Sequence, residues 1–439
     1  MLQSLRNAWR TPELRKKILF TLLIILLYRF GASVPVPYIS SGVMQTFANS
    51  ADGSLFQYMN LLSGDAFSKA TLFALSVSPY ITASIVIQLL TIAIPALERL
   101  SKEGEEGTKK ITAITRYVTV VLALITSFGY YMLMRNSGML TNTGWFPAVV
   151  IIASYCAGAA LVMWLAEKIN ESGIGNGISI ILFANIVSSA PSILSSLYEK
   201  IIVRSEDTNQ VTGISPWGIV VAVAAVLIGI AVVGFVIFMT DAERRIPVQY
   251  AKKVVGRKMY GGQNTNLPIK VNMSGVMPII FANSIVAIPS TIAFFFPTPE
   301  AGSFWYHVQK FFSYESWFYI AVFAVLIVLF SYFYIAISFN PVEVANNLKK
   351  NGGFVPGIRP GKPTADYIKK ILNKITLIGA LFLGVIAVCP LILNQISGNQ
   401  FTRIAFSGSS LLIVVGVVLE TVRELESQLT MRHYKGFLE

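Results

Sequence analysis

One unbroken apolar run of 23 residues, Leu72–Ile94, constrains this chain more than any other stretch. It has no charged residue and would be about 34 Å long as a helix, enough to cross a bilayer core of roughly 30 Å. A shorter, half-apolar piece, Leu55–Phe67, precedes it and is too short to span. Two interpretations fit this shorter piece: a re-entrant segment folded into the mouth of a channel, or an amphipathic helix at the membrane interface.

The composition agrees with a membrane protein. Charged residues make up 13% of the chain and apolar residues 54%, whereas soluble domains have about 25% and 45–50%. Long continuous apolar runs indicate helices, because strands of a transmembrane barrel show only weak alternation over about ten residues. We therefore expect an all-α integral membrane protein.

Ten runs are predicted to span the membrane, with boundaries accurate to a few residues. They are Ile18–Pro37, Leu72–Ile94, Tyr117–Leu133, Trp145–Ala166, Gly177–Leu197, Trp217–Thr240, Met273–Phe296, Trp317–Phe339, Ile375–Leu393 and Ile404–Leu419. The last run is expected to continue into solvent as a polar helix.

The distribution of Lys and Arg predicts the orientation. The side that holds both termini carries 28 of the 35 basic residues, the other side carries 6, and Arg29 lies inside the first run. Positive residues favour the cytoplasmic side, so both termini are expected in the cytoplasm of a cell whose plasma membrane holds the protein. Arg29 is expected to reach the membrane interface along its own side chain.

Two long loops, Asp241–Asn272 and Asn340–Lys374, each carry seven basic residues. Alternating apolar residues near both ends of the first loop predict a two-stranded hairpin. The charges serve either to orient the protein or to bind a polyanionic partner such as a nucleic acid, an acidic protein face or anionic lipid. The residues proposed to contact a partner are Arg244, Arg245, Lys252, Lys253, Arg257, Lys258, Lys349, Lys350 and Arg359.

Several chemistries are not expected. The predicted runs contain no Asp or Glu, which ion-coupled transporters usually need. GIRPGK (Gly357–Lys362) is one residue short of a P-loop, and no nucleophile has a matched base. Two histidines and two cysteines leave no metal cluster. We expect no enzyme activity, no cofactor and no metal.

A mild polar stripe, Ser84, Gln88 and Thr91, follows one face of the second run at helical spacing. Such a stripe usually holds helices together, and the functional alternative is that it flanks a path that opens.

Five strings, in order along the chain, closely resemble the SecY family, whose members form the channel of the bacterial Sec protein translocon. They are PYITASIVIQLL (Pro79–Leu90), KEGEEGTKKI (Lys102–Ile111), ESGIGNGISI (Glu171–Ile180), LPIKVNMSGVMPIIFA (Leu267–Ala282) and FNPVEVANNLKKNGGFVPGIRPG (Phe339–Gly361).

The resemblance implies two inverted, pseudo-symmetric halves of five spans each, residues 1–200 and 201–439. It also implies an hourglass pore closed by a ring of aliphatic side chains, which can exclude water and ions while yielding to a passing chain. By position in the matching strings the ring is Val77, Ile81, Leu182, Ile280, Ile292 and Ile413. Val77 and Leu182 depart from the isoleucine that the family favours.

The same resemblance makes the piece at about residues 55–67 a plug helix, and the second and third spans would face the seventh and eighth as a lateral gate. The plug residues are Leu55, Phe56, Tyr58, Met59, Leu61, Leu62, Gly64 and Phe67, and the gate would include Ser84, Gln88 and Thr91. The implied partners are SecE-like and SecG-like small membrane subunits, the SecA ATPase, the ribosome, signal peptides with their nascent chains, and lipid. Arg359 matches the arginine on which the family's function depends.

Three functions are weighed: a passive protein-conducting channel, a transporter of small solutes and a structural scaffold. The missing carboxylates and the two basic loops argue against the transporter, and the interrupted segment at residues 55–67 argues against the scaffold.

Overall fold

The computed structural model describes residues 2–40, 60, 63–204, 211–214, 216–250, 253–255, 258–260, 264–293, 295, 311, 316–396 and 402–435. Its helices in chain order are α1 (Leu2–Arg10), α2 (Pro12–Gly31), α5 (Ser78–Ala93), α6 (Pro95–Lys102), α7 (Glu105–Asn136), α8 (Trp145–Ser172), α9 (Gly177–Ile201), α10 (Pro216–Asp241), α11 (Met277–Ala293), α13 (Trp317–Ser338), α14 (Pro341–Lys350), α15 (Lys362–Ile396) and α16 (Thr402–Lys435). The strands are β1 (Ile202–Arg204), β2 (Val211–Ile214), β3 (Glu243–Tyr250), β4 (Lys253–Val255), β5 (Lys258–Tyr260), β6 (Asn264–Lys270) and β7 (Gly353–Phe354).

The protein is mostly helical, with a helix at each of the ten predicted runs. Among the described residues four helices, α7, α8, α13 and α15, are long and apolar enough to cross a membrane alone. The pair α5 and α6, bent by 101°, makes a fifth if it is counted as one broken span, and α9, α10 and α11 contain shorter apolar stretches. The chain is thus a mostly helical, multi-pass membrane protein, and its strands are short.

The second predicted run is only partly helical, which corrects the sequence-based prediction. Helix α5 has 16 residues, about 24 Å, and the six residues before it, Leu72–Val77, form turns. The Leu72 amide donates to the Val34 carbonyl at 2.9 Å, and the Ala74 and Ser76 amides close local turns with the carbonyls of Thr71 and Phe73. Apolar composition predicted burial correctly here, but not the backbone conformation.

The two predicted halves of the chain meet at several places, and at one of them α1 packs against α16. Helix α11 packs against α5 and α7, and α9 packs against α10 and α16. The main hydrophobic core draws side chains from α2, α5, α8 and α9 and also from α11, α13, α15 and α16. The core therefore lies between the halves and borders the contacts of α11 and α9, while α1 and α16 share a separate small core that includes Ala8 and Leu425.

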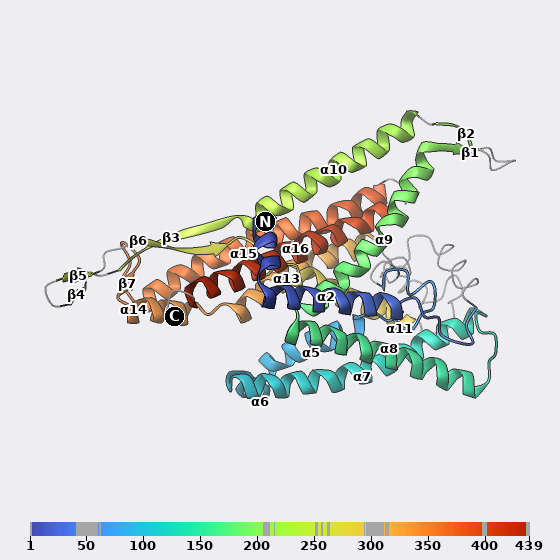
Figure 1. The fold of residues 1–439 in the computed structure, drawn as a ribbon, viewed down its shortest axis with the longest axis horizontal. Coiled ribbons are helices and arrows are strands. Elements are labelled where there is room, and N and C mark those ends of the chain that lie inside the picture. Colours follow the sequence, from blue (N-terminus) through green and yellow to red (C-terminus); the bar gives the residue numbers. More distant parts are fainter. Residues whose placement is uncertain are drawn as a thin grey trace.

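The basic loops and the C-terminus gather at one end of the helices, and the β1–β2 hairpin lies at the other end (Figure 1). The predicted hairpin is confirmed: β3 pairs antiparallel with β6, with Ile246 opposite Leu267. Strand β7, from the second basic loop, adds to the free edge of β3. A small core that includes Ile246, Val355 and Ile368 fixes this sheet on α15. The two loops thus form one unit, the basic platform (β3, β6, β7, α14 and the loop to α15).

Candidate functional site

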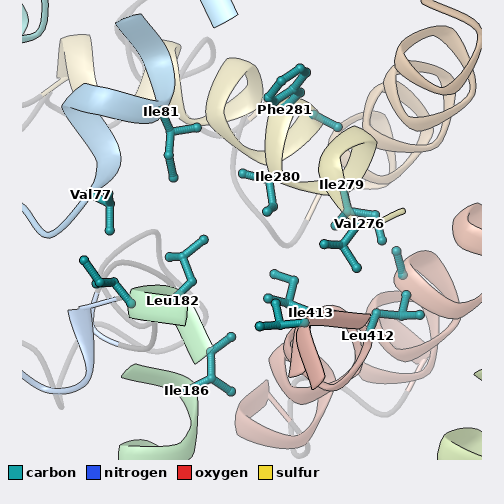
Figure 2. Packing of buried hydrophobic residues seen from close by; sticks show 14 of the residues in the cluster. Val77, Ile81, Leu182, Ile186, Val276, Ile279, Ile280, Phe281, Leu412 and Ile413 are labelled. Atoms are coloured by element: carbon teal, nitrogen blue, oxygen red, sulfur yellow. The ribbon is translucent and has the colours of Figure 1, made fainter. Parts of the chain in front are cut away.

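Five of the six aliphatic side chains predicted to form a ring converge in the structure. They come from the turn before α5 and from α5, α9, α11 and α16, and all are buried in one cluster; these ring residues are Val77, Ile81, Leu182, Ile280 and Ile413. Figure 2 shows their side chains pointing toward a common space. Both halves of the chain therefore contribute to one closure lined by methyl groups.

The helix starts determine where these side chains lie. Ile81, Leu182 and Ile280 are all within the first two turns of α5, α9 and α11. Helix α9 begins where the Asn176 side-chain oxygen accepts a hydrogen bond from the Ile178 amide at 3.1 Å, as an N-cap does. Because three helices begin around the same point, their first turns present aliphatic side chains to one centre.

The sixth predicted member, Ile292, lies apart from the other five. It follows Ile280 by twelve positions, about 18 Å along a helix, and Pro289 lies between them. Its side chain is 45% exposed, whereas the other five are buried. Ile292 nevertheless lines the same cavity as Ile81, Leu182, Ile280 and Ile413, described below, so its place in the ring stays a prediction.

A cavity of about 380 Å³ borders the ring residues where the two halves meet. Side chains of α5, α7 and α11 form most of its wall, and Ile81, Leu182, Ile280 and Ile413 line it as well. No charged side chain of the described residues lines it, and its few polar groups are hydroxyls and the amide of Asn283. Such a wall suits an apolar segment of polypeptide or lipid rather than an ion.

The end of the predicted plug segment contacts this cavity. Phe67 is fully buried and lines the cavity, and its carbonyl accepts a 2.9 Å hydrogen bond from the Tyr130 hydroxyl. The Phe67 and Tyr130 rings lie 4.8 Å apart, and Tyr130 also packs edge-on against Tyr155 at 5.0 Å. The other plug residues named above, apart from Gly64, lie outside the described residues: Leu55, Phe56, Tyr58, Met59, Leu61 and Leu62.

Gly64 marks a turn that the rest of the fold holds in place. Its φ of 61° is left-handed, and a Cβ there would lie 3.1 Å from the backbone of Asn185. The Arg29 guanidinium donates to the Gly64 carbonyl at 3.5 Å. Arg29 thus turns toward the plug segment, and its predicted reach to the membrane interface stays a prediction.

The polar stripe of α5 lies away from the cavity. The α5 residues that line the cavity are Ser78, Pro79, Ile81, Thr82 and Val86. The stripe residues bond locally instead, since the Gln88 amide donates to the Ser84 hydroxyl at 3.5 Å and the Thr91 hydroxyl to the Ile87 carbonyl at 2.7 Å. The structure therefore does not bring the stripe and the ring together.

The basic platform exposes most of the arginines and lysines that the sequence assigned to partner binding. Arg244 and Arg245 lie on β3, Lys349 and Lys350 end α14, and all four are exposed. Lys253 and Lys258 begin β4 and β5, and Lys252 and Arg257 lie outside the described residues.

The loop that carries Arg359 has a defined conformation. Arg359 is exposed, and its carbonyl accepts a 2.8 Å hydrogen bond from the buried Thr364 hydroxyl. Gly357 and Gly361, on either side, have φ values of 80° and 101°, which favour glycine. The guanidinium is therefore presented to solvent from a fixed backbone.

A charged cluster joins β6 to the end of α10 and to Arg423 within α16. Arg423 donates to the Thr240 carbonyl at 2.9 Å and pairs with Asp241. Burial, together with the nearby Arg423 charge, lowers the pKa of the Lys270 ammonium. The folded platform therefore disfavours the charged form of Lys270.

Sequence reasoning missed an ion pair between a buried carboxylate and an exposed arginine. Glu167 is buried near the end of α8, one residue beyond the predicted fourth span, and Arg116 donates to it at 2.9 Å from α7. A span boundary placed a few residues later would have included this carboxylate. Among the described residues no three His, Cys, Asp or Glu side chains are grouped as metal ligands.

Comparisons with known proteins agree with this geometry. A family model described as SecY matches residues 71–422. The protein translocase subunit SecY of Streptomyces scabiei is 43% identical over 452 residues, covering 100% of both chains. The fold is similar to a solved structure of SecY, with a TM-score of 0.60 at 16% identity over 94% of this chain and 92% of that one. The plug domain of that SecY protein is described as stabilising the closed state of the channel and maintaining a membrane seal. Sec61 of the canine ribosome–channel complex has a TM-score of 0.58 at 15% identity, with the same coverage.

Proposed function

This chain belongs to the SecY family of protein translocase subunits, and from that premise we propose that polypeptides cross the membrane between its five ring residues. The protein is a protein-conducting channel and not an enzyme. The observation that carries the proposal is the convergence of Val77, Ile81, Leu182, Ile280 and Ile413 from both halves of the chain beside one apolar cavity.

The chemistry of the ring residues fits a seal that opens for a chain. An aliphatic constriction is poorly wetted, so it blocks ions, and its side chains can move around a polypeptide of any sequence. Phe67, at the end of the plug segment, lines the same cavity and would add a second barrier to ions beside the ring residues. In this proposal the plug comprises about residues 55–67 and leaves when a chain enters.

In this proposal the protein has ten spans in two inverted halves, residues 1–200 and 201–439. The bias of Lys and Arg toward one side supports both termini in the cytoplasm of a plasma-membrane protein. The basic platform and the C-terminus lie at the same end of the helices, which agrees with that orientation (Figure 1).

Lateral release would use the contact between α5, α7 and α11. The cavity lies along this contact, and its wall is apolar apart from a few hydroxyls and one amide. A segment rich in Leu and Ile gains about 0.3–0.6 kcal/mol per residue in the bilayer, while each central charge costs about 2.5–3.5 kcal/mol. Partition would therefore sort apolar segments into lipid and leave polar segments to cross. Ser84, Gln88 and Thr91 would flank this gate.

The energy would come from a partner on the basic platform. Exposed Arg244, Arg245, Lys349, Lys350 and Arg359 lie on one rigid unit, which suits the ribosome or a SecA-type ATPase. The canine relative is a ribosome-bound channel, as its description states. SecE-like and SecG-like subunits would complete the complex.

Photo-crosslinking tests the proposed path. A photoreactive side chain is placed at Ile81 or Leu182, and a stalled signal-bearing nascent chain is presented to the complex. Leu381, exposed on α15, serves as the control position. Crosslinks at Ile81 and Leu182 but not at Leu381 are expected. Crosslinks that form only to probes near Arg359 would mean that the chain docks there and passes elsewhere, which overturns the assignment of the ring residues.

A further inference from the structure

A buried polar hub connects three segments beside the ring residues. The Asn185 amide on α9 donates to the Tyr28 hydroxyl on α2 at 2.9 Å and to the Ser76 hydroxyl at 3.1 Å. The hydroxyls of Tyr28 and Ser76 lie 3.4 Å apart. All three residues are buried, and their neighbours in the same region belong to the main hydrophobic core. Such groups are costly to separate from one another in an apolar setting.

The hub adjoins two of the ring residues through the chain itself. Ser76 immediately precedes Val77, and Asn185 follows Leu182 by three positions, so the two lie on one side of α9. A bond from Asn185 to Ser76 therefore sets the position of Leu182 relative to Val77. Tyr28 adds a third anchor, and its ring stacks on Phe73 at 5.3 Å.

The backbone at Ser76 needs support of this kind. Its φ of 50° is left-handed, a conformation that a non-glycine residue adopts only at a cost in energy. The contacts of the Ser76 hydroxyl with Asn185 and Tyr28 hold the turn that aims Val77 at the centre.

The end of the plug segment rests on the same hub. The backbone of Gly64 packs so closely against the backbone of Asn185 that a Cβ on Gly64 would lie 3.1 Å from the Asn185 Cα and carbonyl oxygen. Asn185 thus touches the plug segment through its backbone and the turn before α5 through its side chain.

We propose that Asn185, Ser76 and Tyr28 are positioning residues that hold Val77 and Leu182 in the closed constriction. The inference rests on the proposed function, because it assumes that the ring residues form the seal. In this proposal a passing chain pushes Val77 away from Leu182, and this separation also parts Asn185 from Ser76. The hub therefore resists opening and favours the closed state until a client enters.

The test uses the complete translocase complex, reconstituted in planar bilayers, and measures the fraction of time that each channel conducts potassium chloride without a client. Tyr28→Phe removes one oxygen and keeps the ring. Ser76→Gly removes the hydroxyl while accepting the left-handed backbone. Thr376→Val is the control, because it deletes a buried hydroxyl on α15 that bonds only within its own helix.

Each hub variant is expected to raise the open fraction about tenfold, the order by which losing a buried hydrogen bond shifts a two-state equilibrium. The thermal midpoint should stay close to that of the Thr376→Val control. The double variant should leak little more than either single variant, because both changes break one hub. A merely structural role would lower the midpoint and leave the open fraction unchanged.

Two further outcomes separate this inference from the proposed function. If Ile81→Lys leaks while both hub variants stay as tight as the control, the positioning role is overturned and the constriction stands. If Ile81→Lys also stays tight, the assignment of the ring residues fails, and the inference fails with it. Equal leaks from the hub variants and Thr376→Val would show a general loss of packing and would also overturn the inference.

Discussion

Replacing Tyr130 with phenylalanine removes one oxygen atom from the contact that holds the end of the plug segment. The hydroxyl lost is the one that donates to the Phe67 carbonyl at 2.9 Å, and the ring contacts with Phe67 and Tyr155 can persist in the variant. The change therefore isolates one hydrogen bond from the packing around it.

The expected shift in the equilibrium between the seated and the displaced plug follows from the burial of the Phe67 carbonyl. Phe67 is fully buried, and a buried acceptor that loses its donor costs about 1–3 kcal/mol. The cost applies only while the plug is seated, because water satisfies the carbonyl once the plug leaves. The equilibrium should then shift toward the displaced plug by about 5- to 150-fold.

Single-channel current through the reconstituted complex measures this shift, and Tyr131→Phe is the matched control. Tyr131 is the next residue on α7 and is also buried, but it makes no hydrogen bond to another described residue. Tyr130→Phe should conduct in the absence of a client, and Tyr131→Phe should stay tight. Equal current from both variants, or none from either, would refute the idea that this hydrogen bond holds the plug.

Three other changes test separate parts of the structure. Gly158→Ala would place a Cβ 2.0 Å from the Leu72 carbonyl oxygen, so α8 and the turns before α5 must separate. The free energy of unfolding should fall by about 1–3 kcal/mol, which lowers the thermal midpoint. Gly229→Ala is the control, because its Cβ would have nothing within 4 Å and the midpoint should not change. Arg359→Glu should slow motor-driven translocation about tenfold and make its rate less sensitive to salt. The thermal midpoint should stay unchanged, because the side chain is exposed. A normal rate would contradict the docking role. Lys270→Gln should raise the free energy of unfolding at pH 7 by less than about 1 kcal/mol after solvent screening, because folding lowers the pKa of this ammonium. The thermal midpoint should rise slightly as a result. That gain should shrink as the pH rises toward 10.5, where the unfolded lysine also loses its charge, and a constant gain across this range would show that the charge is not the cause.

The arrangement of the basic platform has a consequence for how the channel meets its driver. Because β7 pairs with β3, a force on the Arg359 loop reaches the hairpin of the other basic loop through backbone hydrogen bonds. The platform core also packs on α15, which contacts α13 and α16. If a partner binds the platform as proposed, its effect would reach the helices of the C-terminal half through these contacts.

Much of this protein follows from its sequence through simple physics. Uncharged runs of about 20 residues must be buried in lipid or protein, so the positions of the helices could be predicted from composition alone. Alternation of Ile246 and Val248 with polar neighbours predicted the strand that β3 forms. The strings shared with the SecY family predicted which aliphatic residues meet, something that hydropathy does not encode.

Tertiary contacts decided the rest, because they determine where backbone and polar groups find their partners. Leu72–Val77 is as apolar as a helix, yet it forms turns, with its first amide bonded to the Val34 carbonyl and local bonds from Ala74 and Ser76 closing the turns. Asn185 appears in the sequence as an isolated polar residue in an apolar run, and only folding brings Tyr28 and Ser76 within reach of its amide. Ile292 is as aliphatic as Ile280, but its distance along α11 leaves it outside the buried cluster that holds the other five predicted ring residues. A sequence specifies which groups must be buried or paired, while the packed structure decides which of them meet.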